Sequence, residues 1–266
     1  MKRIKRRLPK CSDRQQTDNA GREFNSCGLQ LRAMNGILIA FEGIDGAGKT
    51  TQAIALRARL EAFGETVIFS KEPTDGQWGA RLRASATAGR MPLEDELAAF
   101  IEDRREHLAI KVNPALSAGA TVILDRYFYS TLAYQGARGG QLADIETRVR
   151  DGVTVPDIVF WLDLPVSEAM KRIQVRDGEG NHFEREEDLI KIGEVFRGIA
   201  ATDPVVVRID ASEPPEQVEK CILRALVEGP WKEKRCAKDY GCHDPVHCTP
   251  RIVGDCRWFE LSKQAR

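Results

Sequence analysis

A glycine-rich loop directly after an apolar run is the feature that most restricts what this chain can fold into. Residues 43–50 read Gly-Ile-Asp-Gly-Ala-Gly-Lys-Thr and fit the pattern G-x-x-x-x-G-K-[ST]. The apolar run Ile37–Phe41 precedes them, and the amphipathic segment Thr50–Phe63 follows. Glycines let backbone N–H groups curl around phosphate oxygens without a Cβ in the way, and a following helix presents its positive end to the same anion. The segment therefore predicts a loop that binds a nucleoside triphosphate.

Residues in and beyond this loop indicate how the triphosphate would be held. The predicted nucleotide-binding residues are Gly43, Ile44, Asp45, Gly46, Ala47, Gly48, Lys49, Thr50 and Thr51. The ammonium of Lys49 is expected to reach the β- and γ-phosphates, and the Thr50 hydroxyl is expected to ligate Mg²⁺. The apolar run Thr121–Asp125 ends in a carboxylate that would hold the same ion. We therefore predict a metal site made of Thr50 and Asp125.

Arg126 follows this carboxylate directly, on the phosphate side of the expected sheet. An arginine there is of little use if water accepts the phosphoryl group. Its planar fork instead suits an acceptor that is itself a phosphate, which it can bind bidentately. An arginine paired with a carboxylate for structural reasons is the alternative.

Short β-branched runs alternate with longer amphipathic segments between residues 37 and 227. The predicted strands are Ile37–Phe41, Thr66–Ser70, Thr121–Asp125, Ile158–Asp163 and Val205–Asp210. The predicted helices are Thr50–Phe63, Leu93–Ser117, Ser130–Arg138, Val166–Arg176, Glu184–Ala200 and Pro215–Val227. Because the strands are nearly all apolar, they are expected to be buried on both faces of a parallel sheet. The alternation predicts a three-layer α/β fold, whose ligands bind beyond the carboxyl ends of the strands.

One predicted helix carries an unusually charged stretch, EDRREHL at residues 102–108. It contains Asp103, Arg104, Arg105 and His107. Taken alone, this pattern is typical of a solvated, charged helix face.

Composition excludes several classes of protein. The chain has 266 residues, 42% of them hydrophobic and 30% charged, which allows one sizeable core. No run approaches eighteen apolar residues, so we expect no membrane span. The net charge is zero, yet residues 1–33 carry nine Lys/Arg against three Asp/Glu, and residues 229–266 carry eight against five. An acidic body with basic ends argues against a nucleic-acid binder, whose positive charge would lie on the folded surface.

The two ends are expected to lie outside the folded domain, which we place at residues 34–228. Residues 1–33 lack apolar periodicity and a secretory core, so they are interpreted as a basic, disordered arm, a presequence or an over-extended start. Gly229-Pro230 should break the last helix, leaving residues 229–266 as a poorly structured tail. Seven cysteines without a secretory signal indicate a reducing cytoplasm.

The tail contains most of these thiols. Cys236, Cys242, Cys248 and Cys256 lie near His243 and His247. They are enough soft ligands for a tetrahedral Zn²⁺ site. No pair has C-x2-C spacing, so free thiols are the favoured interpretation and zinc is the alternative.

Together, these segments resemble the thymidylate kinase family of P-loop nucleoside monophosphate kinases, which phosphorylate dTMP to dTDP with ATP. The resemblance covers about residues 35–227, and FEGIDGAGKTTQ (41–52) and DRYFYSTLAYQG (125–136) are its most specific parts. PDIVFWLDLP (156–165) and the lid-like KRIQVRDGEGNHFE (171–184) agree with it. The resemblance implies a P-loop kinase fold with a five-stranded parallel sheet, Mg²⁺ as cofactor, ATP and dTMP as substrates, and usually a homodimer.

The resemblance also implies a set of substrate-binding residues. They are Glu72, Arg83, Phe100, Arg104, Arg126, Thr131, Tyr134 and Gln135. Phe100 would stack on the thymine ring, and Arg104 would hydrogen-bond the base edge. Arg126 and Arg83 would hold the dTMP phosphate, while the last three residues would border the base and sugar.

Transfer between two phosphates needs no protein base, because a dianionic phosphate is already a competent nucleophile. The protein must align the two anions and neutralise the charge on the transferred group. Positions 46 and 47 are Gly and Ala, so the loop supplies no arginine and the lid is expected to supply it. The expected catalytic residues are Lys49, Asp45, Arg126, Arg176 and Arg185. Closure of the lid would exclude water and prevent hydrolysis of ATP.

Departures from the family pattern keep alternatives open. The segment 71–76 reads Lys-Glu-Pro-Thr-Asp-Gly where the family has Arg-Glu-Pro-Gly-Gly-Thr, and the lid segment 181–184 lacks the usual arginine. KEPTDGQW (71–78) is also similar to a segment of deoxynucleoside kinases, whose glutamate deprotonates a sugar hydroxyl. The alternatives are a kinase for another pyrimidine nucleotide or a deoxynucleoside, or a nucleotide-binding regulator with a decayed lid. Lys49, Thr50, Asp125 and Arg126 are all intact, which counts against decay.

Overall fold

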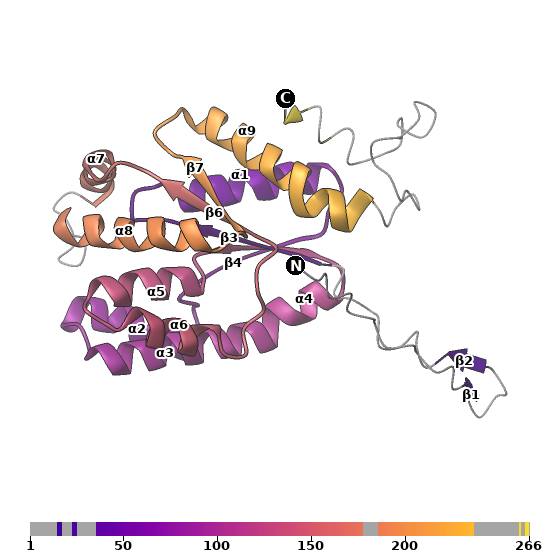
Figure 1. The fold of residues 1–266 in the computed structure, drawn as a ribbon, viewed down its shortest axis with the longest axis horizontal. Helices are drawn as coiled ribbons and strands as arrows, with labels where there is room; N and C mark the ends of the chain where they lie inside the picture. The colour runs from indigo at the N-terminus through magenta and orange to yellow at the C-terminus, as the bar shows by residue number, and fades with distance from the viewer. Residues whose placement is uncertain are drawn as a thin grey trace, which may run out of the picture.

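Five parallel strands form the central sheet of the protein, here in a computed structural model (Figure 1). The structure describes residues 36–177 and 186–236, together with residues 15–17, 23–25, 261 and 264–265. The strands are β3 (Ile37–Glu42), β4 (Val67–Lys71), β5 (Thr121–Asp125), β6 (Ile158–Asp163) and β7 (Val206–Asp210). Their order in the sheet is β4-β5-β3-β6-β7, and every pair is parallel. The five predicted strands are confirmed to within one residue at each end.

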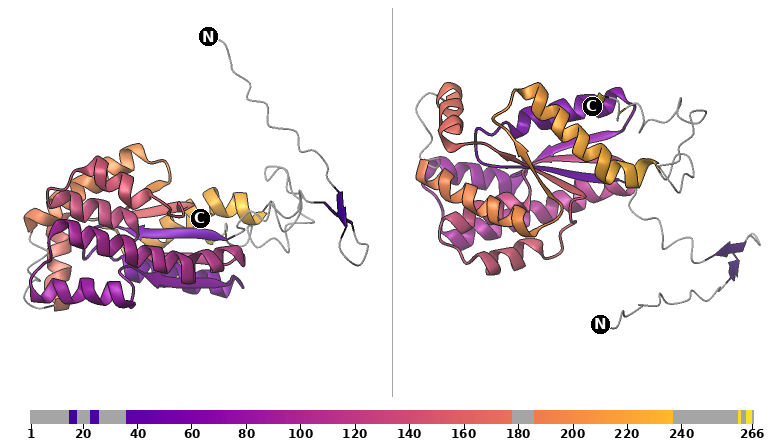
Figure 2. Two further views of the ribbon diagram at one scale, coloured as in Figure 1. Left: turned by 90° about the horizontal axis from the view of Figure 1, so that it is seen from below. Right: turned by 45° about the horizontal axis from the view of Figure 1, so that its top comes forward.

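Helices cover both faces of this sheet, which gives the predicted three layers (Figures 1 and 2). On one face lie α1 (Lys49–Ala62) and α9 (Pro215–Leu226). The opposite face carries α3 (Leu93–His107), η2 (Leu108–Val112), α4 (Asn113–Ser117), α5 (Phe128–Ala137) and α8 (Glu186–Thr202). The remaining helices are α2 (Gln77–Ala88), α6 (Leu142–Arg150) and α7 (Val166–Asp177). The α/β fold class is confirmed.

Two of these helices, α2 and α6, were not among the predicted elements. Helix α2 reads QWGARLRASATA, in which glycine, serine and threonine weaken the helical pattern. Helix α6 has only nine residues and buries only Ile145 and Val149. Helix α2 packs on α3, and α6 packs on α5 and α3, rather than on the sheet. Their apolar residues are therefore placed to meet other helices, and sequence alone does not indicate that contact.

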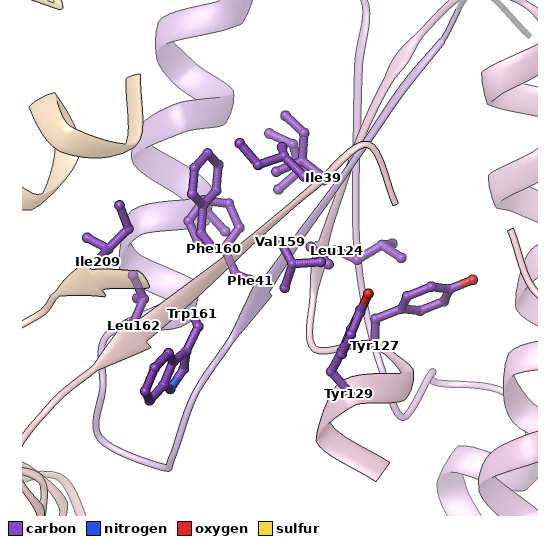
Figure 3. Packing of buried hydrophobic residues seen from close by; sticks show 14 of the residues in the cluster. Ile39, Phe41, Leu124, Tyr127, Tyr129, Val159, Phe160, Trp161, Leu162 and Ile209 are labelled. Atoms are coloured by element: carbon purple, nitrogen blue, oxygen red, sulfur yellow. The ribbon is translucent and has the colours of Figure 1, made fainter. Parts of the chain in front are cut away.

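The core lies on both faces of the central strands (Figure 3). Successive side chains of a strand point to opposite faces. Phe41 of β3 and Phe160 of β6 meet on the side of α1, with ring centroids 5.3 Å apart. Trp161, the next residue of β6, stacks on Phe196 of α8 on the opposite side. These strands are therefore fixed from both sides, which sets the position of the loops at their carboxyl ends.

The segment that follows α9 also packs on the core. It continues as η3 (Val227–Cys236), with non-helical φ and ψ at Gly229, where the break was predicted. Trp231 is only 1% exposed and belongs to the main hydrophobic cluster, as do Leu261 and Ala265. Lys234 Nζ lies 2.7 Å from Asp157 Oδ1 and donates to the carbonyl of Gly36. Residues beyond the expected boundary at 228 thus contribute to the core. Residues 1–14 and 237–260 lie outside the described residues, and the latter include Cys242, Cys248, Cys256 and both tail histidines of the possible zinc site.

Near the N-terminus, β1 (Gln15–Thr17) and β2 (Glu23–Asn25) pair antiparallel. In the part of the chain that the structure describes, no helix has the length and apolar character needed to cross a bilayer.

The burial of Trp231 predicts a measurable contribution to stability. Trp231→Ala should lower the free energy of unfolding by about 3 to 5 kcal/mol, because the cavity would be large. Lys234→Ala is the control, since its partly exposed pair with Asp157 contributes about 1 kcal/mol or less. Urea unfolding of the full chain measures both. Equal, small losses for the two variants would contradict the packing seen for Trp231.

Candidate active site

The glycine-rich loop between β3 and α1 forms one wall of a cleft of about 700 Å³. Gly46 and Gly48 have φ values of 75° and 91°, which side-chain-bearing residues rarely adopt. No side chain among the described residues caps α1, and its first turn contains no acidic residue. Its first N–H groups are therefore available to an anion, and the helix dipole favours negative charge at the same place.

Residues from several elements line this cleft. They are Asp45, Gly46, Ala47, Gly48, Lys49, Thr50, Thr51, Gln52, Asp125, Arg126, Arg172, Arg176, Ala211, Glu213, Pro215 and Val218. The set includes the predicted loop residues from Asp45 to Thr51. Gly43 and Ile44 begin the loop but do not line the cleft.

Lys49 and Asp45 illustrate how burial and charge oppose each other here. Lys49 is 5% exposed, and its ammonium donates to the carbonyl of Ile44 over 2.7 Å. Burial, assisted by the charge of Arg126, lowers the pKa of Lys49 to about 7, against the pull of nearby carboxylates. Burial alone would raise the pKa of Asp45, but the hydrogen bond from Arg176 and the charge of Lys49 bring it down to about 2. Arg176 reaches Asp45 through both terminal nitrogens, at 2.6 and 3.2 Å.

Thr50 and Asp125 meet at the floor of the cleft, where Thr50 Oγ1 donates to Asp125 Oδ2. Mg²⁺ is commonly bound through one or two carboxylates together with substrate phosphates and water. This pair supplies such an oxygen set, and so fits the ion. Among the described residues, no group of three or more His, Cys, Asp or Glu side chains could hold a metal without such help.

A second, smaller pocket of about 130 Å³ lies beside the cleft. Its lining residues are Glu72, Pro73, Arg90, Phe100, Arg104, Arg126, Tyr127, Ser130, Thr131, Tyr134 and Gln135. Seven of the eight predicted substrate-binding residues are thus brought together. Within the described part of the chain, two fully buried donors of this lining, Arg104 NH1 and Gln135 Nε2, have no hydrogen-bond partner. Buried donors are normally satisfied, so a ligand with two acceptors is expected here.

Arg126 lines both the cleft and the pocket. Its φ of 70° is in the left-handed region, an unusual place for a residue with a side chain. Neighbouring contacts hold it there, because Arg126 N donates to the carbonyl of Phe41 at 3.0 Å and Arg126 NH1 donates to Ser130 Oγ at 3.3 Å. Its NH2 group lies 4.0 Å from Asp45 Oδ1.

Glu42, at the end of β3, holds the start of α5 beside Arg126. Its Oε1 accepts from the backbone N–H groups of Tyr127 and Ser130, and its Oε2 accepts from Ser130 Oγ. Glu42 is fully buried, and burial raises its pKa to about 7 in spite of these hydrogen bonds. Sequence reasoning missed this role, although a glutamate in an otherwise apolar strand was a visible signal.

The interpretation of residues 102–108 as a solvated face is wrong. Asp103, Arg104 and His107 are at most 5% exposed, and only Arg105 of this group faces solvent. Each has a partner elsewhere in the chain: Asp103 accepts from Thr74 N and Oγ1, and Arg104 pairs with Glu72. The charges are buried because these partners arrive from about 30 residues away, which a local pattern does not show.

Two predicted residues are not gathered at the site. Arg83 is exposed and donates to the carbonyls of Pro73 and Thr74, so it holds the loop after β4 rather than lining the pocket. Arg185 lies outside the described residues, as does lid segment 181–184.

Sequence reasoning also missed the far wall of the cleft, formed by Arg172, Ala211, Glu213, Pro215 and Val218. Four of these residues follow β7, so the rule that ligands bind beyond the carboxyl ends of strands could have found them.

A phosphate loop, a Thr–Asp pair and an arginine shared with a second pocket define a P-loop phosphotransferase. The chain belongs to the thymidylate kinase family, whose family model, described as Thymidylate kinase, matches residues 41–222. It is 47% identical over 191 residues to a thymidylate kinase of Akkermansia muciniphila, covering 72% of this chain and 91% of that relative. Thymidylate kinases of Xanthomonas campestris pv. campestris and Xanthomonas oryzae pv. oryzae are 43% identical over 195 residues, covering 73% of this chain and 86% of theirs. The predicted family membership is confirmed.

The raised pKa of Glu42 predicts a pH-dependent stability. Between pH 4.5, the ordinary pKa of a glutamate, and about pH 7, Glu42 keeps its proton in the folded state, whereas the unfolded chain has released it. The free energy of unfolding should therefore fall as pH rises through this window, by roughly 3 kcal/mol from this group. Glu42→Gln should lack that fall. Denaturant unfolding from pH 4.5 to 8 measures the difference, and parallel profiles for the two proteins would contradict the assignment.

Proposed function

We propose that the protein transfers the γ-phosphoryl group of ATP to dTMP and releases dTDP. The observation that carries the proposal is the position of Arg126, which lines both the cleft and the smaller pocket. An arginine between two sites can bind the acceptor phosphate while facing the phosphates of the donor. Membership of the thymidylate kinase family supports the same reaction.

On the donor side, the loop 43–51 would bind the triphosphate with its N–H groups and with Lys49. Burial disfavours the charged form of Lys49 in the free protein, and phosphate oxygens beside it would favour that form again. Thr50 and Asp125 would hold Mg²⁺, which when bound offsets charge on the β- and γ-phosphates. Asp45 would lie near the ion and the acceptor phosphate.

On the acceptor side, the smaller pocket would bind the base and sugar. Phe100 offers a flat apolar surface to the base, while Arg104 and Gln135 offer two buried donors that have no partner among the described residues. The thymine edge carries two carbonyl oxygens, so it fits this donor pair. Thr131 and Tyr134 complete the lining. Arg83 would bind the dTMP phosphate from its position beside the loop after β4.

The lid would supply the positive charge that the loop lacks. Arg176 already reaches the cleft through its bidentate contact with Asp45. In the reaction, Arg176 or Arg185 would neutralise the transferred group while the closed lid excludes water. The homodimer expected from the family stays a prediction.

The deoxynucleoside kinase alternative requires a free glutamate at position 72. Both oxygens of Glu72 already have partners: Oε1 lies 3.0 Å from His107 Nδ1, and Oε2 accepts from Arg104 at 2.8–2.9 Å. A carboxylate held in this way is poorly placed to take a proton from a sugar hydroxyl. This arrangement supports a phosphate acceptor.

The reaction is tested with purified protein, ATP and Mg²⁺ against dTMP, thymidine and other pyrimidine monophosphates. We expect rapid formation of dTDP from dTMP and a large loss of kcat in Lys49→Ala, because this contact strengthens as charge develops on the phosphoryl group. A loss of 10²-fold or more is expected, whereas Arg57→Ala, at an exposed position of α1 that pairs with Glu61 and does not line the cleft, should leave kcat unchanged. If thymidine rather than dTMP were phosphorylated, the proposal would be wrong.

The role of Arg126 predicts a different kinetic signature. Arg126→Ala should raise KM for dTMP at least tenfold, and raise KM for ATP much less, because the arginine binds the acceptor phosphate. Arg126→Lys should recover part of the charge but not the bidentate fork. Steady-state kinetics with each substrate varied in turn measures both. Equal losses for the two substrates would mean that Arg126 serves the donor or the fold.

A further inference from the structure

A chain of hydrogen bonds runs from the edge strand β4 to the smaller pocket. Ser70 Oγ lies 2.9 Å from His107 Nε2, and His107 Nδ1 lies 3.0 Å from Glu72 Oε1. Glu72 Oε2 in turn accepts from Arg104 Nε and NH2, at 2.9 and 2.8 Å. We refer to Ser70, His107 and Glu72 as the relay, and to Arg104 as its end.

The partners fix the direction of every proton in the relay. A carboxylate only accepts, so the proton of a neutral His107 belongs on Nδ1, facing Glu72. His107 Nε2 is then an acceptor, and the Ser70 hydroxyl donates to it. Lys111 Nζ donates to Ser70 Oγ at 3.1 Å, which leaves the Ser70 proton free to point at the imidazole. The relay therefore selects a single tautomer of His107 and a single orientation of Glu72.

Glu72 holds one edge of the Arg104 guanidinium. The hydrogens on Nε and one on NH2 go to Glu72, and NH2 also donates to Thr131 Oγ1 at 2.9 Å. NH1 is buried and has no hydrogen-bond partner in the part of the chain that the structure describes, while Arg104 lines the pocket. Because a guanidinium is planar, fixing that edge also fixes the direction of NH1.

Such an arrangement suits discrimination between bases. A fixed, buried donor binds a carbonyl oxygen well, but an amino group at the same place would leave two donors facing each other. A site built to hydrogen-bond one group can reject an analogue by several orders of magnitude. A guanidinium free to turn would lose part of that selectivity, since it could rotate away from the amino group.

We propose that His107, supported by Ser70, is a positioning residue that fixes Glu72 and thereby the direction of the NH1 group of Arg104. The pocket would in this way select a 4-keto over a 4-amino pyrimidine. The inference rests on the proposed function, since it names what determines base choice at that acceptor site. His107 touches no substrate in this scheme and acts through Glu72.

The test compares dTMP with 5-methyl-dCMP, two nucleotides whose bases differ only in the 4-keto or 4-amino group and in the accompanying hydrogen on N3. His107→Asn places an amide nitrogen near the position of Nδ1 and can still donate to Glu72, whereas His107→Gln extends toward Ser70 and loses that donor. Arg105→Ala is the control, because Arg105 lies on the same helix, is exposed, and pairs only locally with Glu102 among the described residues.

We expect the parent and Arg105→Ala to prefer dTMP strongly in kcat/KM. His107→Gln should reduce that preference at least tenfold, through KM for dTMP and with KM for ATP unchanged. His107→Asn should stay within about threefold of the parent. Ser70→Ala, a milder change, should reduce the preference about threefold, and it decides the question if His107→Gln does not fold.

Two outcomes overturn the proposal. One is an equal fall for dTMP and 5-methyl-dCMP in His107→Gln or Ser70→Ala, which indicates a structural role alone. The other is a parent without preference for the 4-keto base. Calorimetric binding of both nucleotides to the parent and variants keeps this test separate from the reaction. A parent that binds dTMP selectively but does not phosphorylate it would refute the proposed function and leave the relay to be decided by the binding constants.

Discussion

The site depends on one buried carboxylate, that of Glu42. Glu42 lies at the end of β3 and accepts hydrogen bonds from backbone N–H groups at the start of α5. It thereby joins the strand before the phosphate loop to the helix that lines the acceptor pocket. Arg126 lies between these two elements in a left-handed conformation that few side-chain-bearing residues adopt. Glu42 fixes Tyr127 and Ser130, which follow Arg126 in the chain. The carbonyl of Phe41 fixes the N–H of Arg126 itself. The distance between the two binding sites is therefore set by the sheet and not by a flexible loop.

Burial of this carboxylate and of Lys49 has a cost, which shows in their pKa values. Both lie near 7, each moved toward the neutral form by removal from water. In a core without ligand, such groups are destabilising unless they are paired. A phosphate anion beside Lys49 favours its charged form, so substrate binding relieves part of that cost. The site is thus organised at the expense of the free protein's stability, as is common where charged ligands bind.

The donor half of the site could be predicted from sequence, because it is built from contiguous residues. Eight residues in the loop, with a strand before and a helix after, define backbone geometry that depends little on the rest of the chain. The strands were predictable for a similar reason, since a strand buried on both faces needs an apolar run. Helices α2 and α6 were not, because each packs on other helices and not on the sheet. Trp231 was also missed, since nothing local indicates that a residue after a helix break returns to the core.

The acceptor half is different, because side chains from separate segments build it. Glu72 follows β4, Arg104 and His107 come from α3, and Thr131 and Gln135 come from α5. Charged residues on α3 had the pattern of a solvated face, and only the arrival of Glu72 and Thr74 makes their burial favourable. Resemblance to a family supplied Arg104 and Glu72, but neither the direct contact between them nor the contact of His107 with Glu72. Residues that bind the phosphates of the donor can be recognised from one contiguous stretch of sequence. Residues that select the base of the acceptor can be recognised only in the folded structure, where separate segments come together.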